Sequence, residues 1–329
     1  MRRRPFGSTG LGVSQVGLGC ARLGGFFAGE PRRYEDLIAA AVDGGINFFD
    51  TADMYSQGES ESLLGRAFRG RRNQVVIATK AGWRLPARRL LAARIKPLLR
   101  PLVRRLGLRR EKLSAAIRGE PDQDFTPRYL RTALEASLRR LRTDHVDLFQ
   151  LHSPPAATVE RGEWIGALED LRREGKLRYY GVSCDTEEAA QAAFRHRGIA
   201  SVQIAVNLLE RRAAEAVLPA AAEAKVGVIA RECLANGLLA KEGAALDLGR
   251  YCSNPEERER RAKQLDSYAR IASANGCTLR QLALQYVSSL EGVSVALVGA
   301  SSADQLRDCL QQLARPQAPP GAFRPAAGA

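Results

Sequence analysis

Short apolar runs alternate with helical patterns along nearly the whole chain, and this alternation restricts the possible folds more than any other feature. The runs are too short, and too rich in β-branched and aromatic residues, to be amphipathic helices, so they are predicted strands. Each is followed by apolar side chains at helical spacing. The eight predicted strands are Val16–Gly19, Ile46–Asp50, Val75–Thr79, Val146–Leu151, Tyr179–Val182, Val202–Val206, Val226–Ile229 and Val293–Val298.

Strands that alternate with helices in this way run parallel, because each crossover helix returns the chain to the same end of the sheet. We therefore expect an α/β fold, a closed (β/α)8 TIM barrel with its helices outside. The predicted helices are Tyr34–Asp43, Ser60–Phe68, Pro127–Leu141, Trp164–Glu174, Glu187–His196, Ala213–Ala224, Pro255–Asn275, Leu279–Ser288 and Ala303–Leu313.

A single barrel is expected to account for residues 1–315. The segments Arg3–Phe6 and Gly12–Val16 flank the turn residues Ser8-Thr9-Gly10, so an N-terminal β-hairpin is predicted before the first barrel strand. Residues 316–329 are rich in proline, alanine and glycine. They are predicted to form a loosely ordered tail that could lie over the barrel.

Much of the formal net charge of +14 comes from one segment. Eleven basic residues lie between Arg84 and Lys112 against one acid, Glu111, and leucines follow one helical face of this stretch. Residues 84–124 are therefore predicted to be a basic helical insertion after the third strand, kinked at Pro97 and Pro101. A lid over the mouth of the barrel is the favoured interpretation, while an acidic partner or an anionic substrate remains an alternative. Nucleic acid is not expected, because aromatic residues are not interleaved with the basic ones.

The remaining composition narrows the class of protein. The six cysteines are scattered without a C-x-x-C pair, and with only three histidines no metal site is expected. No apolar stretch reaches the roughly 20 residues of a membrane span. The basic start Met1-Arg2-Arg3-Arg4 is followed by Gly7-Ser8-Thr9-Gly10 rather than by an apolar segment. We expect a cytoplasmic protein with reduced thiols.

Four ionisable residues lie at or just past the downstream ends of predicted strands: Asp50, Tyr55, Lys80 and His152. In a barrel of this type the loops at those ends build the active site, so the four side chains are expected to converge. Taken singly, Asp50 could be a helix cap, Tyr55 a packed surface tyrosine and Lys80 a solvated lysine. Together at one face of one barrel they predict a catalytic site.

These residues and their neighbours resemble the motifs of the aldo-keto reductase family. The resemblance rests on Asp50-Thr51-Ala52-x-x-Tyr55, on Lys80 after Val75–Thr79, on Leu151-His152-Ser153-Pro154 and on Gly181-Val182-Ser183, and it extends from about Phe6 to Leu313. It implies the reduction of an aldehyde or ketone to an alcohol by hydride transfer from NADPH. Tyr55 would be the general acid, assisted by Lys80, Asp50 and His152, and a cation beside the phenol would depress its pKa.

The resemblance also assigns the dinucleotide site. Ser183 and Gln203 would bind the nicotinamide carboxamide, and Arg231 would stack where many members have an aromatic ring. Cys184 takes a position at which the family usually has asparagine. Contacts to the dinucleotide are expected from Cys20, Ser183, Cys184, Gln203, Arg231, Leu234, Gly237, Leu239, Gly299, Ser301, Gln305, Asp308 and Cys309.

The segment before the last helix bears on the choice of dinucleotide. The resemblance places the adenosine 2′-phosphate near Ser301, and amides at a helix N-terminus attract phosphate. The family often has an arginine near Ser301 and more often has asparagine at Cys309, so NADPH is expected and NADH stays possible. The substrate pocket is predicted to include Arg22, Phe26, Phe27, Met54, Trp83 and Ser153.

Other functions are compatible with parts of this pattern. A non-catalytic barrel of the same family could bind nicotinamide to regulate or sense, as the potassium-channel β-subunits do. A lyase forming a Schiff base through Lys80 is a third possibility. The run Gly17-Leu18-Gly19-Cys20-Ala21-Arg22 lacks the third glycine of a Rossmann fingerprint. A small carbonyl compound is the expected partner, and the sequence specifies neither its identity nor the oligomeric state.

Overall fold

The structure, a computed structural model, describes residues 1–24, 31–84, 122–240, 247–316 and 323. Its barrel strands are β3 (Val16–Gly19), β4 (Phe48–Asp50), β5 (Val76–Ala81), β8 (Val146–His152), β9 (Leu177–Ser183), β10 (Ile199–Ala205), β11 (Gly227–Arg231) and β12 (Val293–Gly299). They close into an eight-stranded barrel in the order β10-β11-β12-β3-β4-β5-β8-β9, with every neighbouring pair parallel. The predicted (β/α)8 barrel is confirmed.

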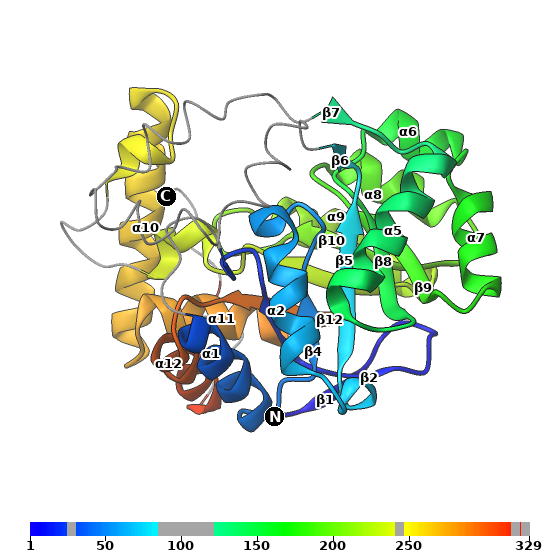
Figure 1. Cartoon of the computed structure of the whole chain (residues 1–329). Coiled ribbons are helices and arrows are strands. Elements are labelled where there is room, and N and C mark those ends of the chain that lie inside the picture. Colours follow the sequence, from blue (N-terminus) through cyan, green and yellow to red (C-terminus); the bar gives the residue numbers. More distant parts are fainter. Residues whose placement is uncertain (25–30, 85–121, 241–246, 317–322, 324–329) are drawn as a thin grey trace, which may run out of the picture.

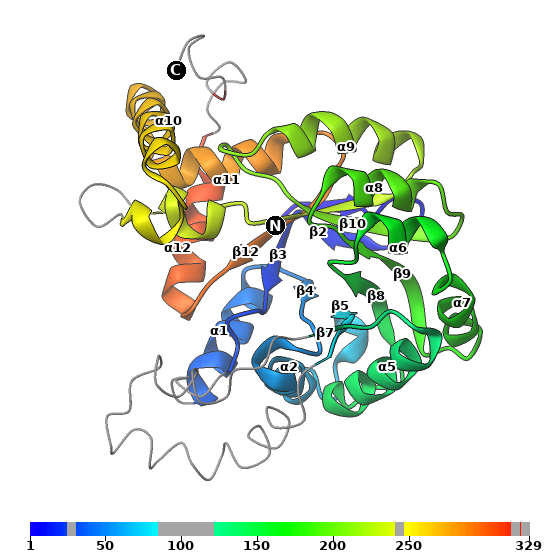
Figure 2. The same ribbon diagram turned by 90° about the horizontal axis from the view of Figure 1, so that it is seen from above.

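Helices surround the strands as a ring, which Figure 2 shows from above. They are α1 (Pro31–Asp43), α2 (Glu59–Ala67), α5 (Pro127–Leu141), α6 (Ala156–Arg161), α7 (Ile165–Arg173), α8 (Glu187–Phe194), α9 (Arg212–Glu223), α10 (Pro255–Ala274), α11 (Leu279–Ser289) and α12 (Ala303–Ala314). Several begin where a side chain accepts a hydrogen bond from a backbone N–H of the first turn, as Thr126, Thr186 and Ser302 do. The short α6 was not predicted.

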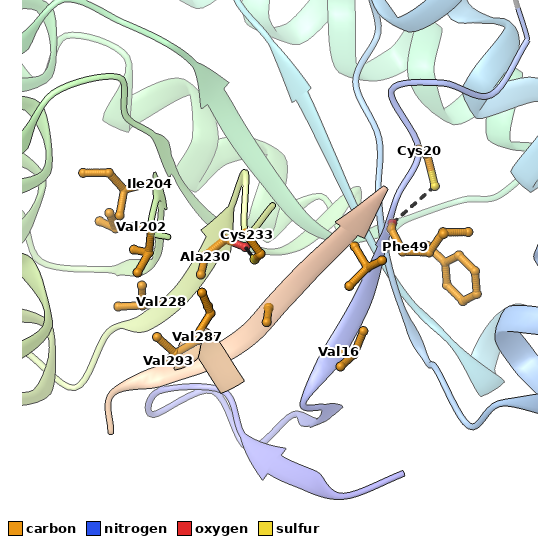
Figure 3. Packing of buried hydrophobic residues seen from close by; sticks show 14 of the residues in the cluster. Val16, Cys20, Phe49, Val202, Ile204, Val228, Ala230, Cys233, Val287 and Val293 are labelled. Atoms are coloured by element: carbon orange, nitrogen blue, oxygen red, sulfur yellow. Dashed lines mark hydrogen bonds between the residues drawn. The ribbon is translucent and has the colours of Figure 1, made fainter. Parts of the chain in front are cut away.

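Each barrel strand sends alternate side chains to opposite faces, and the two faces bury different clusters. Phe49, Val228 and Ala230 point out of the barrel into the large cluster beneath the helices, part of which Figure 3 shows. Phe48 and Ile229, one residue away, point into the barrel and pack in a second cluster. This period of two follows from strand geometry. Burial on both faces therefore requires runs that are apolar throughout.

An N-terminal hairpin closes one end of the barrel. Strands β1 (Arg3–Pro5) and β2 (Gly12–Ser14) pair antiparallel, as predicted. Phe6 follows β1, is fully buried and packs on Phe48 with ring centroids 5.8 Å apart. The backbone N–H of Ser8 also donates to the carbonyl of Lys225 at 2.9 Å. This end is consequently filled by apolar side chains, and chemistry is restricted to the other end.

Two predicted segments lie largely outside the described residues. Of the basic insertion at 84–124, the structure describes only its flanks, where β6 (Trp83–Arg84) pairs antiparallel with β7 (Asp122–Gln123). Of the tail at 316–329 it describes Pro316 and Phe323, whose ring packs on Tyr286 at 5.7 Å. In the part of the chain that is described, no helix is long and apolar enough to cross a membrane.

Candidate active site

The inward side chains of the strands change from apolar to polar toward their C-terminal ends. On β5 the inward series is Val76, Ala78 and then Lys80, and on β4 Phe48 is followed by Asp50. The ammonium of Lys80 donates to both carboxylate oxygens of Asp50, at 2.7 and 2.6 Å, and to the carbonyl of Thr51 at 2.9 Å. Lys80 and Asp50 are only 1% and 3% exposed, so water hardly competes for this ion pair.

Tyr55 lies beside this pair on the short turn η1 (Tyr55–Gly58). Ser56 and Gln57 have φ of 52° and 58°, so the chain reverses directly after the tyrosine and aims its ring into the barrel mouth. The Lys80 nitrogen lies 5.2 Å from the centroid of the Tyr55 ring. The His152 ring, at the end of β8, meets the Tyr55 ring edge-on at 5.8 Å. The structure thus brings all four predicted catalytic residues together.

Burial and charge act in opposite directions on the two proton-carrying groups. Burial would lower the pKa of Lys80, but attraction and hydrogen bonding by Asp50 and Tyr55 outweigh it, so the pKa is raised and the amine stays an ammonium. For Tyr55, burial raises the pKa, and the charge and hydrogen bond of Lys80 lower it only in part. The net direction is upward, contrary to the sequence expectation of a depressed pKa. The phenol therefore keeps its proton near neutral pH.

His152 is held neutral at the same site. Burial, followed by the charges of Lys80 and Arg231, lowers the pKa of its imidazole to about 3. Its Nδ1 atom is buried without a hydrogen-bond partner among the described residues. A neutral imidazole carries one hydrogen-bond donor and one acceptor. His152 can therefore donate a hydrogen bond to a carbonyl oxygen without adding a positive charge to the site.

A cavity of about 350 Å³ opens above these side chains. It is bordered by backbone and side chains from the C-terminal ends of seven barrel strands, which agrees with the usual position of a barrel active site. The lining residues are Gly19, Ala21, Arg22, Asp50, Tyr55, His152, Ser153, Ser183, Asp185, Gln203, Arg231, Glu232, Cys233, Leu234, Asn236, Gly237, Ala240, Leu297, Val298, Gly299 and Gln305.

Many of the residues predicted to contact dinucleotide or substrate line this cavity, and others do not. Those that line it are Ser183, Gln203, Arg231, Leu234, Gly237, Gly299, Gln305, Arg22 and Ser153. Cys20 and Cys184 lie in the core beside it, where the Cys184 thiol faces the carbonyl of Val182 at 3.8 Å and offers the cavity no donor. Six further predicted residues are not part of the cavity lining: Leu239, Ser301, Asp308, Cys309, Met54 and Trp83. Phe26 and Phe27 lie outside the described residues.

Two acidic lining residues were missed by the sequence reasoning. Asp185 lies two residues past β9 and Glu232 directly past β11, positions that the strand-end rule would have singled out. Arg231 donates to the Asp185 carboxylate at 2.7 Å and to the Cys184 carbonyl at 3.1 Å, and it also pairs with Glu232. This ion pair spans the gap between β9 and β11 and fixes the guanidinium at the cavity wall.

At the far end of the cavity, α12 begins at the cap Ser302. The amide and hydroxyl of Ser301 both donate to the Gln305 side chain, at 2.8 and 3.0 Å. Arg33 of α1 reaches across and donates through Nε to the Ser301 carbonyl at 2.7 Å. Arg33 is thus a cation near Ser301 that comes from a distant part of the sequence, and it was also missed.

The residues present suit a dinucleotide. Ser183 and Gln203 offer a hydroxyl and an amide next to the catalytic group, which can pair with a carboxamide. Added Cβ atoms at Gly237 and Gly299 would meet nothing closer than 3.9 Å, so the backbone at both positions is open to the approach of a ligand. The orphaned Nδ1 of His152 gives a further polar contact at the buried end.

Comparison with known proteins agrees with this arrangement. The model of the Aldo/keto reductase family matches residues 15–319. The oxidoreductase YqkF of Bacillus subtilis (strain 168) is 30% identical over 318 residues, which cover 94% of this chain and 90% of that protein.

Solved structures with the same barrel point the same way. The aldo-keto reductase AKR11C1 from Bacillus halodurans, in its holo form, superposes with a TM-score of 0.79 at 29% identity, over 98% of this chain and 94% of that one. The glycerol dehydrogenase AKR11B4 from Gluconobacter oxydans gives a TM-score of 0.77 at 26% identity, over 97% and 92% of the two chains. The barrel and these matches together establish that the chain belongs to the aldo/keto reductase family and is an NAD(P)H-dependent oxidoreductase.

Proposed function

We propose that this enzyme reduces an aldehyde or ketone to the alcohol with NADPH, and that Tyr55 donates the proton. The observation that carries the proposal is the buried ammonium of Lys80, which is held by Asp50 at 2.6 Å and lies 5.2 Å from the centre of the Tyr55 ring. A cation fixed beside a phenol at a cavity wall serves the transfer of a proton to an oxygen that is gaining negative charge.

The charges of the four side chains suggest a separate role for each of them. When bound, the nicotinamide supplies the hydride that reduces the carbonyl carbon. Tyr55 holds its proton until the carbonyl oxygen becomes basic, and Lys80 stabilises the phenolate left by the transfer. Asp50 keeps the ammonium charged and oriented. His152, neutral because its pKa is lowered to about 3, donates a hydrogen bond that orients the substrate oxygen.

The preference for NADPH over NADH is proposed from the start of α12. Exposed amides of a helix N-terminus favour a phosphate, and Arg33 adds a cation next to Ser301. Arg280 lies near the same helix but is paired with Asp308 and with the Ala240 carbonyl, so it is less available. Arg33 would serve where other family members carry an arginine close to Ser301 in sequence.

The test is turnover of NADPH by the purified protein with a panel of aldehydes and ketones. The expected result is oxidation of NADPH that depends on the carbonyl compound and falls by about 10²-fold or more in Tyr55→Phe. Tyr129→Phe is a matched control, because Tyr129 donates to the carbonyl of Trp83 and does not line the cavity.

The same assay separates the proposal from a purely regulatory role. A barrel that only senses nicotinamide would bind NADPH and turn over none of the panel, and Tyr55→Phe would then change nothing. Borohydride trapping distinguishes the third alternative, a Schiff base on Lys80. No trapping is expected, because Lys80 is kept as a hydrogen-bonded ammonium and is therefore not nucleophilic.

A further inference from the structure

Gln203 contacts both the expected dinucleotide site and the proton-donating centre. It points inward from β10, is 1% exposed, and donates through Nε2 to the Oδ1 atom of Asp50 at 2.8 Å. Its Oε1 accepts from the hydroxyl of Ser183, at 3.1 Å on the neighbouring strand β9. The Asp50 atom Oδ1 therefore accepts from two donors, Lys80 and Gln203.

The orientation of this amide is dictated by chemistry. The Asp50 carboxylate can only accept hydrogen bonds, so the nitrogen of Gln203 must face it and the oxygen must face the Ser183 hydroxyl. In this orientation, Nε2 has one N–H to spare and Oε1 one lone pair to spare, beside a cavity that both Ser183 and Gln203 line.

We propose that Gln203 is a positioning residue that couples the dinucleotide to the acid centre, because its amide fixes Asp50 against Lys80 while its free lone pair receives the N–H of the nicotinamide carboxamide. The inference rests on the proposed function and adds to it. A carboxamide that donates to Oε1 polarises the Gln203 amide and strengthens the bond from Nε2 to Asp50. Binding of the dinucleotide thus tightens the anchor of Lys80 at the moment when Tyr55 must act.

Glutamate at this position gives a sharp test. Gln203→Glu places a second carboxylate against Asp50, and the hydrogen bond between them survives only while the two share a proton. The ionisable groups that face this point are Lys80 from β5, Tyr55 from η1, His152 from β8, Arg231 from β11 and the Cys20 thiol after β3. Lys80 and Tyr55 are held protonated and His152 neutral, so the added carboxyl is the group beside Asp50 expected to titrate between pH 5 and 9. Asp53, whose backbone N–H donates to the Lys80 carbonyl and whose pKa is raised to about 7, titrates in the wild type as well, so the test is the difference between variant and wild type.

The kinetic experiment measures kcat at saturating NADPH from pH 5.5 to 8.5. We expect Gln203→Glu to lose about tenfold in kcat as the pH rises, which corresponds to about one pKa unit of differential interaction, while the wild type changes little. Gln203→Met, which has no donor at any pH, is expected to lower kcat throughout. Ser183→Ala is the matched comparison, since Ser183 contacts the same amide but not Asp50. It should raise the KM for NADPH and keep the wild-type pH profile of kcat.

A binding experiment makes the inference independent of turnover. The Kd of NADPH, followed by its fluorescence without substrate, should rise about tenfold from pH 6 to 8.5 in Gln203→Glu and much less in the wild type. If the wild type binds NADPH and reduces no carbonyl compound, the proposed function fails, while this pH dependence still tests the coupling. The inference is overturned if both Gln203 variants raise only KM and Kd, with kcat and its pH profile unchanged. If Gln203→Glu does not fold, Gln203→Met provides the test alone: a lower kcat supports the coupling, and a change confined to KM and Kd overturns it.

Discussion

The ammonium of Lys80 and the carboxylate of Asp50 form a two-pronged ion pair, with both oxygens within 2.7 Å of the nitrogen and both side chains buried in the barrel. Such a pair is costly to break from one side, because the partner that remains is an uncompensated charge. Its geometry is therefore tied to the stability of the fold as well as to the proposed catalysis.

Lys80→Met should separate these two roles. We expect it to lower the free energy of unfolding by about 3–5 kcal/mol, because Asp50 is left charged and buried. Turnover should also fall, by about 10²-fold or more. The double variant Asp50→Leu/Lys80→Met should recover much of the stability in urea unfolding and none of the turnover. If the double variant recovered turnover as well as stability, Lys80 would not be needed for proton donation by Tyr55.

His152 should remain neutral across the working range of pH. Its pKa, lowered to about 3 chiefly by burial, means that the imidazole gains a proton only in strong acid. The Cε1–H resonance of His152, assigned by its loss in His152→Gln, should not shift between pH 8 and 5. We further expect His152→Gln to retain more turnover than His152→Leu, since an amide can still donate to the substrate oxygen. A resonance that titrates near pH 6.5 would rule out the neutral donor.

Asp53 should make the fold less stable as the pH rises. Burial, and then repulsion by Glu61, raise the pKa of this carboxyl from 3.8 to about 7, while Arg140 partly offsets them. Its Oδ1 atom has no hydrogen-bond partner among the described residues. Because the pKa is higher in the folded than in the unfolded chain, the stabilising effect of the proton is complete below pH 4 and is lost as the pH passes through 7.

Asp53→Asn removes that titration. Relative to the wild type, the variant should therefore gain stability between pH 4 and 8, by about 2 kcal/mol, a value reduced from the full linkage because the side chain is partly exposed. Thermal unfolding at several pH values measures this difference. Asp36→Asn on the surface of α1 gives the matched comparison. A constant difference between variant and wild type would show that Asp53 does not carry the proton.

Arg33 should discriminate between the two dinucleotides. If it faces a 2′-phosphate beside Ser301, Arg33→Gln should raise the Kd of NADPH about fivefold, typical of an exposed charge contact, and leave the Kd of NADH nearly unchanged. Arg32→Gln, one residue earlier on the same helix and also exposed, is the control. Equal weakening of NADPH and NADH would assign Arg33 to the scaffold instead.

Most of the barrel was predictable because its strands are apolar on both faces and therefore form continuous runs. Phe48 and Phe49 illustrate this, since one packs inside the barrel and the other beneath the helices. The pair β6 and β7 was not predictable, because a strand of two residues such as Trp83–Arg84 has no periodicity to detect.

The site was predictable in its residues more than in its electrostatics. Asp50, Lys80 and His152 follow from their places at strand ends, and Tyr55 from its motif. The rise in the pKa of Tyr55 could not be foreseen, because it depends on how completely neighbouring chains exclude water from the phenol. The contact of Arg33 on α1 with Ser301, just before the cap of α12, joins segments far apart in sequence, and no local pattern marks it.

The N-terminal hairpin that precedes Phe6 also places the chain's N-terminus at the end of the barrel opposite the cavity, and this affects how the enzyme can be fused or immobilised. Met1 is 46% exposed and lies at the lower end of the molecule in Figure 1, whereas His152 ends β8 and Tyr55 follows β4 at the opposite, C-terminal ends of the strands. A tag, a fused protein or a solid support joined at Met1 would therefore sit behind the barrel. Immobilised in this way, the enzyme would keep its mouth turned toward the solution and its reactants.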